Sequence, residues 1–246
     1  MNDNEVKTML WFGFECETFE FAGREAFIVH PSGAPCGKLL LKTEYMDAFP
    51  AFDIAMLEKG WYLIHVQHKN RWATDDEIQL MADFVRHCAQ KLDVPARCAL
   101  VGLSCGGLQA ARFAARYPEL TAVLYLDAPV LSIPSMAGTG VLGDDMVALF
   151  WPEIAAAYGL DRADLAEFRR SPVDELPLLI QNRIPVVLVY GDADTTVIWQ
   201  ENGKILEEFY RENGGELCVI AKPGVAHHPH GLEDPTPVVE FVQAHC

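Results

Sequence analysis

Positive charge is scarce in this sequence. Its 246 residues include 19 Lys and Arg against 35 Asp and Glu, which gives a formal net charge of -16. A surface of this sign repels the phosphates of nucleic acids and the anionic headgroups of membranes. We therefore expect no nucleic-acid partner and no membrane partner. A neutral small molecule is the simplest ligand to expect, although a local basic pocket would be compatible with the overall charge.

Paired cysteines and long apolar runs are also missing. The seven cysteines are scattered and include no Cys-x-x-Cys pair, so neither a zinc site nor a dithiol redox site of that type is indicated. No stretch approaches the length that crosses a bilayer, and segment 1–7 has no basic stretch leading into an apolar run. We therefore expect reduced thiols and a cytoplasmic location.

The hydrophobic pattern predicts strands that alternate with helices. Segments 11–21 and 24–30 alternate apolar and polar side chains around Ala22-Gly23, which predicts an antiparallel hairpin at a sheet edge. Further strands are expected at 38–43, 61–66, 98–103, 123–128, 186–191 and 217–220, and helices at 52–58, from 74 to Pro95, after Ser104, and at 235–244. This order predicts one α/β domain over 1–246, with a mostly parallel sheet between two layers of helices.

One segment breaks the alternation. Between Ala128 and Pro185 the chain is too long for a plain crossover between strands. It contains loops with Gly and Pro, the aromatic pair Phe150-Trp151 and a stretch of helical pattern at 161–170. We predict that residues 129–185 form a small cap insertion over a substrate pocket.

The most informative stretch is Gly102-Leu103-Ser104-Cys105-Gly106, which joins the predicted strand 98–103 to an alanine-rich helix. A serine at such a sharp turn needs small residues two positions away on each side, because a Cβ there would collide with the adjoining backbone. The helix that follows aims its N–H groups at the space above the serine. The pattern predicts Ser104 as a nucleophile and the N–H of Cys105 as an oxyanion donor. A structural tight turn is the alternative interpretation.

A serine nucleophile needs an imidazole base and a carboxylate that orients the imidazole. Asp192 and Asp194 both follow the predicted strand 186–191. We favour Asp194, because Gly191 lets the chain turn and the acid can reach inward while Val197 packs. An Asx turn or a helix cap is the alternative role for either acid.

Three histidines lie between the last predicted strand and the last predicted helix, where the base is expected. His227 is our candidate, followed by His228 and then His230. The cluster could instead bind a metal. However, no carboxylate or cysteine ligands occur nearby at a recognised spacing, and we expect no metal and no other cofactor.

The chain order Ser104, Asp194, His227 resembles that of the α/β-hydrolase superfamily, and the resemblance covers nearly the whole chain. The tail 222–237 is similar to a bacterial group often described only as α/β hydrolases or as carbohydrate esterases. Ala226 departs from the glycine that usually precedes the histidine. The usual His-Gly motif after the early strand is also absent, so we assign the second oxyanion donor by position to the N–H of Tyr45, with Met46 as the alternative.

The resemblance implies a three-layer α/β-hydrolase fold and a serine esterase acting on a small-acyl ester, such as an acetylated carbohydrate or a related plant-derived ester. Trp72 and Trp151 are candidate substrate-binding residues. Two other functions stay open, namely an amidase or peptidase with the same triad and a non-catalytic binding module that retains the fold. The oligomeric state is not predictable from the sequence.

Overall fold

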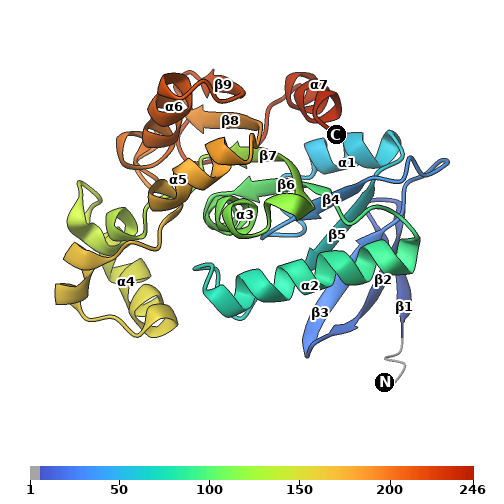
Figure 1. Ribbon diagram of the computed structural model, residues 1–246, viewed down its shortest axis with the longest axis horizontal. Coiled ribbons are helices and arrows are strands. Elements are labelled where there is room, and N and C mark those ends of the chain that lie inside the picture. The colour runs from blue at the N-terminus through green and yellow to red at the C-terminus, as the bar shows by residue number, and fades with distance from the viewer. Residues whose placement is uncertain (1–5) are drawn as a thin grey trace.

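A mostly parallel sheet forms the centre of the molecule, with helices on both faces (Figure 1). The computed structural model describes residues 6–246, and over this range the sheet has nine strands in the order β1-β2-β3-β5-β4-β6-β7-β8-β9. Most of the N-terminal segment 1–7, on which the expectation about a leader sequence rests, lies outside the described residues. Within residues 6–246, no helix has the length and apolar character needed to cross a membrane.

The strands are β1 (Lys7–Trp11), β2 (Phe14–Phe21), β3 (Arg24–Val29), β4 (Leu39–Lys42), β5 (Tyr62–Val66), β6 (Cys98–Leu103), β7 (Thr121–Asp127), β8 (Val186–Gly191) and β9 (Leu217–Lys222). The α-helices are α1 (Ala51–Glu58), α2 (Asp75–Leu92), α3 (Cys105–Arg116), α4 (Asp144–Tyr158), α5 (Pro172–Gln181), α6 (Gly203–Glu212) and α7 (Thr236–Ala244). Four short helical turns complete the structure: η1 (Pro118–Leu120), η2 (Ser135–Thr139), η3 (Arg162–Glu167) and η4 (Trp199–Glu201).

The N-terminal edge of the sheet is an antiparallel meander. The predicted hairpin at Ala22-Gly23 is confirmed, since β2 and β3 pair on either side of it. A second turn at Phe12-Gly13 was not predicted, so the expected strand 11–21 begins only at Phe14 as β2, and β1 (Lys7–Trp11) is an additional strand before the turn. Both residues of this turn have positive φ, 46° at Phe12 and 92° at Gly13, which is the conformation that lets a two-residue turn match the twist of its strands.

Two apolar cores cover the two faces of the sheet. On one face α2, α3, α5 and α6 pack together, and on the other face α1 and α7 do. Strands β4, β6, β7 and β8 lie between these layers with almost every residue buried, which explains why they are continuous apolar runs in the sequence. The predicted three-layer α/β architecture is confirmed.

The segment 129–185 contains more helices than its sequence pattern indicated. Helix α5 packs beside α3 as an ordinary layer helix, whereas η2 and α4 lie beyond the carboxyl ends of the parallel strands (Figure 1). The helical pattern at 161–170 corresponds to the short turn η3. Helix α4 was not predicted. It contains Pro152, a residue that disfavours a helix interior, and it is stabilised by buried Phe150 and Ile154.

A buried ion pair fixes the loop that follows β4. Lys42 is fully buried, and its Nζ lies 2.5 Å from the Asp53 carboxylate on α1. The same ammonium donates to the carbonyl of Ala48, 2.6 Å away. The loop between Lys42 and α1 is therefore anchored from inside the protein.

Removing only the acid of this pair should be strongly destabilising. Asp53→Ala leaves the Lys42 ammonium buried without its counter-charge, and we expect a loss of about 3–5 kcal/mol in the free energy of unfolding, measured with urea. The double variant Lys42→Met/Asp53→Leu removes both charges and should be closer to the parent protein. An Asp53→Ala variant that unfolds at the same midpoint urea concentration as the parent protein would contradict this account.

His65 on β5 should make folding sensitive to acid. Burial lowers its pKa to about 4, and its Nδ1–H donates to the carbonyl of Lys42. The unfolded chain binds a proton near pH 6.5 and the folded chain near pH 4, so stability is lost as the pH falls through this window. Between about pH 7.5 and about pH 5 the loss should be about 2 kcal/mol. Urea unfolding of His65→Gln should show this acid dependence reduced by that amount, and an unchanged slope would refute the assignment.

Candidate active site

Ser104 lies at the sharp turn between β6 and α3, with φ 52° and ψ -120°. This positive φ is unusual for a residue with a side chain. The two flanking glycines are needed for different reasons. A Cβ at Gly102 would lie 2.7 Å from the carbonyl oxygen of Gly106 within the turn itself, whereas a Cβ at Gly106 would lie 3.0 Å from the hydroxyl of Thr43, which follows β4. The local sequence thus holds Ser104 at the apex, as its spacing predicted.

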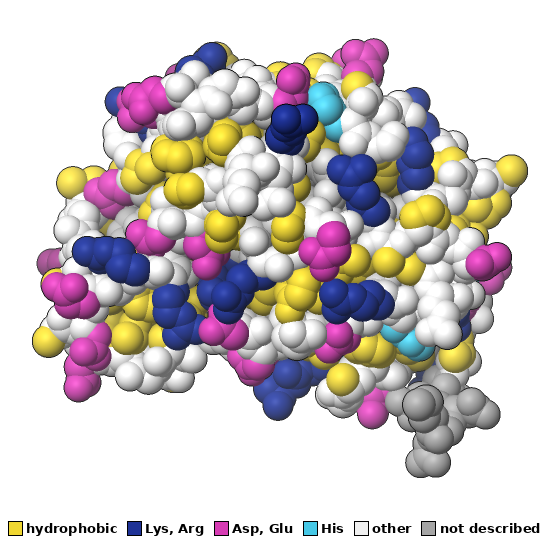
Figure 2. Space-filling view, in the orientation of Figure 1, with side chains coloured by type: hydrophobic (Ala, Val, Ile, Leu, Met, Phe, Trp, Pro, Cys, Tyr) yellow, Lys and Arg dark blue, Asp and Glu magenta, His cyan; other side chains and the backbone are white. Residues whose placement is uncertain are grey.

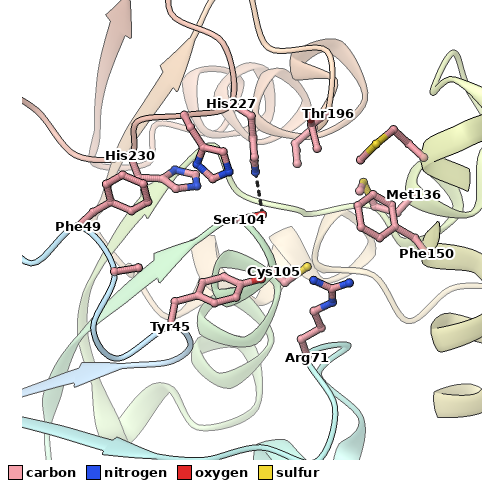
Figure 3. A pocket seen from close by; sticks show the side chains of 14 residues that line it. Tyr45, Phe49, Arg71, Ser104, Cys105, Met136, Phe150, Thr196, His227 and His230 are labelled. Carbon is pink, nitrogen blue, oxygen red and sulfur yellow. Dashed lines mark hydrogen bonds between the residues drawn. The ribbon is translucent and has the colours of Figure 1, made fainter.

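The structure brings Ser104, His227 and Asp194 together in one hydrogen-bonded chain. The Nε2 atom of His227 lies 3.0 Å from the Ser104 Oγ (Figure 3), and its Nδ1 lies 2.7 Å from the Oδ2 of Asp194. His227 follows β9 and Asp194 follows β8, so the three side chains meet at the carboxyl edge of the sheet. This is the geometry in which a base can remove a serine proton while a carboxylate orients the base.

The two acids after β8 have different partners. Oδ1 of Asp194 accepts the N–H groups of Thr196 and Val197, which leaves Oδ2 for His227. Burial raises the pKa of Asp194, but hydrogen bonds from His227, Val197 and Thr196 outweigh burial and hold this pKa below its usual value. Asp192 is exposed and accepts the N–H of Gly224, so it has the turn-stabilising role that was the alternative for either acid.

The loop 223–231, which carries the three histidines and is called the histidine loop below, is held by Asp127, a residue that was not predicted to belong to the site. Asp127 is fully buried at the end of β7. Its carboxylate accepts the N–H of Gly231 at 2.6 Å, contacts His230 Nδ1 at 3.2 Å and pairs with the Lys222 ammonium at 3.3 Å. In the sequence, Asp127 could have been identified as an acid at the carboxyl end of an otherwise apolar strand. His230 is thus a positioning element of the loop.

His228 is the exposed member of the histidine cluster, and its ring stacks on Phe49 with centroids 5.7 Å apart. Nitrogen atoms of the three histidine rings lie within 4.8 Å of one another. His227 already uses Nδ1 for Asp194 and Nε2 for Ser104. A metal held by all three rings would therefore have to displace one of these two hydrogen bonds.

Ser104 opens into a cavity of about 430 Å³ (Figure 3). Its lining is largely apolar and comes from the loops after β4 and β5, from the turn between β6 and α3, from η2 and α4, and from the loops after β8 and β9. The lining residues are Tyr45, Ala48, Phe49, Arg71, Ser104, Cys105, Met136, Met146, Phe150, Thr196, Val197, His227, His228 and His230. Tyr45 and Phe49 have φ of 56° and 50°, a strained conformation that is frequent at functional sites.

The two residues predicted as oxyanion donors both border this cavity. Cys105 is the first residue of α3, where the N–H has no acceptor within the helix. Tyr45 lines the same cavity from the anchored loop after β4. Burial raises the pKa of the Cys105 thiol to about 11, so this thiol stays protonated at neutral pH. The neighbouring Glu44 does not line the cavity, because Gln109 holds its carboxylate at 2.8 Å.

The two tryptophans expected to contact substrate lie outside this cavity lining. Trp72 is completely buried, and its Nε1–H donates to Glu153. Trp151 packs under the guanidinium of Arg162, 4.2 Å from the ring centroid. Their sequence neighbours Arg71 and Phe150 line the cavity instead. Consecutive residues project in different directions, so an aromatic pair in a sequence does not reveal which of its members faces a pocket.

Gly191 offers a test of how strictly the histidine loop must be placed. A Cβ at this position would lie 2.2 Å from the carbonyl oxygen of Val225, two residues before His227. We expect Gly191→Ala to displace the loop and lower kcat/KM by about 100-fold. Gly33→Ala is the matched control, because a Cβ there would meet nothing within 4 Å. Equal kinetics for the two variants would contradict a tightly positioned loop.

Solved structures of similar fold include enzymes of several kinds. Dipeptidyl peptidase 4 from Porphyromonas gingivalis is 16% identical with a TM-score of 0.67, and the match covers 99% of this chain and 36% of that one. S-formylglutathione hydrolase from Agrobacterium tumefaciens is 16% identical with a TM-score of 0.64, covering 98% and 96% of the two chains. Est1E from Butyrivibrio proteoclasticus is 17% identical with a TM-score of 0.57, covering 97% and 96%.

These likenesses show the fold. The chain spans little more than a third of the peptidase and nearly the full length of the other two proteins. No protein-family model matches the sequence, and no curated protein has significant sequence similarity to it. The chain has the α/β-hydrolase fold.

Proposed function

We propose that this chain, with its α/β-hydrolase fold, is a serine hydrolase that cleaves small carboxylic esters. The hydrogen-bonded series Ser104, His227, Asp194 carries the proposal, because it opens onto a cavity at the carboxyl edge of the sheet. Ligand sites of open α/β sheets lie at this edge. Residues 129–185 act as a cap in this proposal, since Met136, Met146 and Phe150 close one side of the cavity.

The reaction proceeds in two halves. In the first, Ser104 Oγ attacks the ester carbonyl carbon while His227 Nε2 takes the hydroxyl proton. The tetrahedral intermediate collapses, the C–O bond to the alcohol breaks, and His227 returns the proton to the departing alkoxide. In the second half His227 deprotonates a water molecule, which attacks the acyl-serine, and the acid leaves as the proton returns to Ser104. Asp194 orients the imidazole and stabilises its cationic form throughout.

Two backbone N–H groups stabilise the oxyanion in this scheme, those of Cys105 and Tyr45. The Cys105 N–H adds the positive end of the α3 dipole. Because Gln109 holds the Glu44 carboxylate, this negative charge is kept out of the cavity lining. The scheme needs no metal and no organic cofactor.

The dimensions and lining of the cavity favour a small acyl group. A cavity of about 430 Å³ whose apolar lining includes Phe, Met and Val side chains accommodates a short apolar chain rather than a polymer. An acetylated carbohydrate or a plant-derived ester is supported only by the resemblance of the tail 222–237. Amide or peptide cleavage is the second candidate, because one of the similar folds belongs to a dipeptidyl peptidase.

Hydrolysis of matched esters and amides tests this function. We expect turnover of 4-nitrophenyl acetate and butyrate, slower turnover of the octanoate, and kcat/KM at least about 100-fold lower for the corresponding 4-nitroanilides. Comparable rates for anilides or aminoacyl anilides would favour the amidase. No turnover in either series, together with specific binding of an ester, would favour the binding module.

A further inference from the structure

The residues that line the cavity differ in charge from the chain as a whole. The protein has 35 acidic residues and a formal charge of -16, but no Asp or Glu is among the 14 residues that line the cavity beside Ser104. The lining contains instead one arginine, Arg71, and three histidines. The overall charge of the chain favours a neutral ligand, whereas a lining that has Arg71 and no acid favours the binding of a negatively charged group in the cavity.

Arg71 is held in place from outside the cavity. Its Nε and Nη2 donate to the two oxygens of Glu153, both at 2.9 Å, and Glu153 also accepts the indole N–H of Trp72. The guanidinium lies over the rings of Trp72 and Phe150, 5.5 and 5.4 Å from their centroids. Glu153 is on α4 and is not in the cavity lining, so the carboxylate fixes Arg71 without occupying the cavity.

Glu153 does not use the remaining guanidinium nitrogen, Nη1, and the other hydrogen-bond partner of the guanidinium is the Tyr45 side chain, which lines the same cavity. Figure 3 shows the guanidinium directed into the cavity between Cys105 and Phe150. The Glu153 side chain is 44% exposed, so solvent weakens its neutralisation of Arg71. A guanidinium stays protonated at neutral pH and forms strong hydrogen bonds with carboxylates.

We propose that Arg71 binds a carboxylate of the substrate, and that the preferred esters are monoanions with a free carboxylate besides the ester. This inference rests on the proposed hydrolase function. One guanidinium, whose pairing with the exposed Glu153 is weakened by solvent, suits a single negative charge, and the apolar side chains of the lining exclude water and strengthen the pairing. Arg71 is a specificity residue in this account, and Ser104, His227 and Asp194 perform the bond cleavage.

Two pairs of esters test the inference, and each pair differs only in a carboxylate. On the acyl side, mono-4-nitrophenyl glutarate is compared with its methyl ester, and release of 4-nitrophenol is measured. On the alcohol side, 4-acetoxybenzoate is compared with methyl 4-acetoxybenzoate, and release of acetate is measured. We expect kcat/KM at least about tenfold higher for the anion in one pair, and the pair that responds shows which side of the ester bears the charge.

Arg71→Met should reduce the preference for the anion by about tenfold or more, and Arg71→Lys should reduce it less, because the charge remains while the planar fork is lost. The preference is a ratio measured on one protein preparation, so a partial loss of folded enzyme does not affect it. Arg86→Met is the control, since Arg86 is an exposed partner of Asp83 and Glu119. Its preference should equal that of the parent.

Each result has a distinct consequence. The role of Arg71 would be overturned if the neutral esters were hydrolysed as well as the anions in both pairs, or if the preference for the anion were unchanged in Arg71→Met. Either result would leave the hydrolase proposal intact. No hydrolysis of any of the four esters, with Ser104 unreactive toward a phosphonylating probe, would overturn the hydrolase proposal and this inference with it. A preference that disappears in Arg71→Met and persists in Arg86→Met supports both.

Discussion

Ser104→Ala is expected to abolish ester hydrolysis, with a loss of about 10⁴ to 10⁶ in kcat. The variant keeps the backbone and the cavity but removes the only atom that can form the acyl-enzyme in this scheme. Its folding should be preserved, because Ser104 is held at the turn by backbone hydrogen bonds to Asp127 and Val130. Initial rates with 4-nitrophenyl acetate and thermal unfolding of the same preparation measure the two effects.

The matched control for this variant is Ser32→Ala. Ser32 is an exposed serine in the turn before β4, far along the chain from the site. Its kinetic constants should stay within about twofold of the parent values, as is usual for surface substitutions. Residual hydrolysis by Ser104→Ala at one tenth of the parent rate or more would mean that another group, or another route, attacks the ester.

Asp194→Asn should lower kcat by about 10⁴ without unfolding the protein. An asparagine keeps the size of the side chain, and its oxygen can still accept the N–H groups of Thr196 and Val197. Its amide would then present N–H donors toward Nδ1 of His227. The imidazole would be held in the tautomer that has its proton on Nε2, where it cannot accept the proton of Ser104.

Asp192→Asn tests whether this loss is specific to the second acid. The two residues are two positions apart, and Asp192 contacts the N–H of Gly224 rather than a histidine. An asparagine oxygen can accept the same N–H, so we expect kcat within about threefold of the parent value. Equal losses in the two variants would show that the loop needs both carboxylates for its shape, and would contradict the role of Asp194 in orienting His227.

The arrangement of Ser104, Asp194 and His227 was predictable because each residue occurs in a local pattern with a steric or topological reason. No Cβ fits at Gly102 within the turn, and a Cβ at Gly106 would crowd Thr43 after β4. The acid and the histidine follow β8 and β9, and the carboxyl ends of parallel strands meet at one edge. The sheet could be predicted on the same basis, since its buried strands are apolar runs of regular spacing.

The rest of the cavity depends on packing that a single sequence does not encode locally. Helix α4 contains Pro152 and was not predicted, although its Phe150 lines the cavity. Which member of the pair Phe150-Trp151 faces inward depends on how α4 is rotated against the body of the domain. The role of Asp127 was also not predictable from the local sequence, because its partners on the histidine loop are about 100 residues away along the chain.

Fluorophosphonate labelling followed by peptide mass spectrometry tests the central claim most directly. The account predicts one adduct per chain, located on the hydroxyl of Ser104, with labelling absent in Ser104→Ala and at least about 100-fold slower in His227→Ala, because the imidazole activates the serine. An adduct on another residue, or a folded parent protein that hydrolyses esters without reacting at Ser104, would contradict the assignment of Ser104 as the nucleophile.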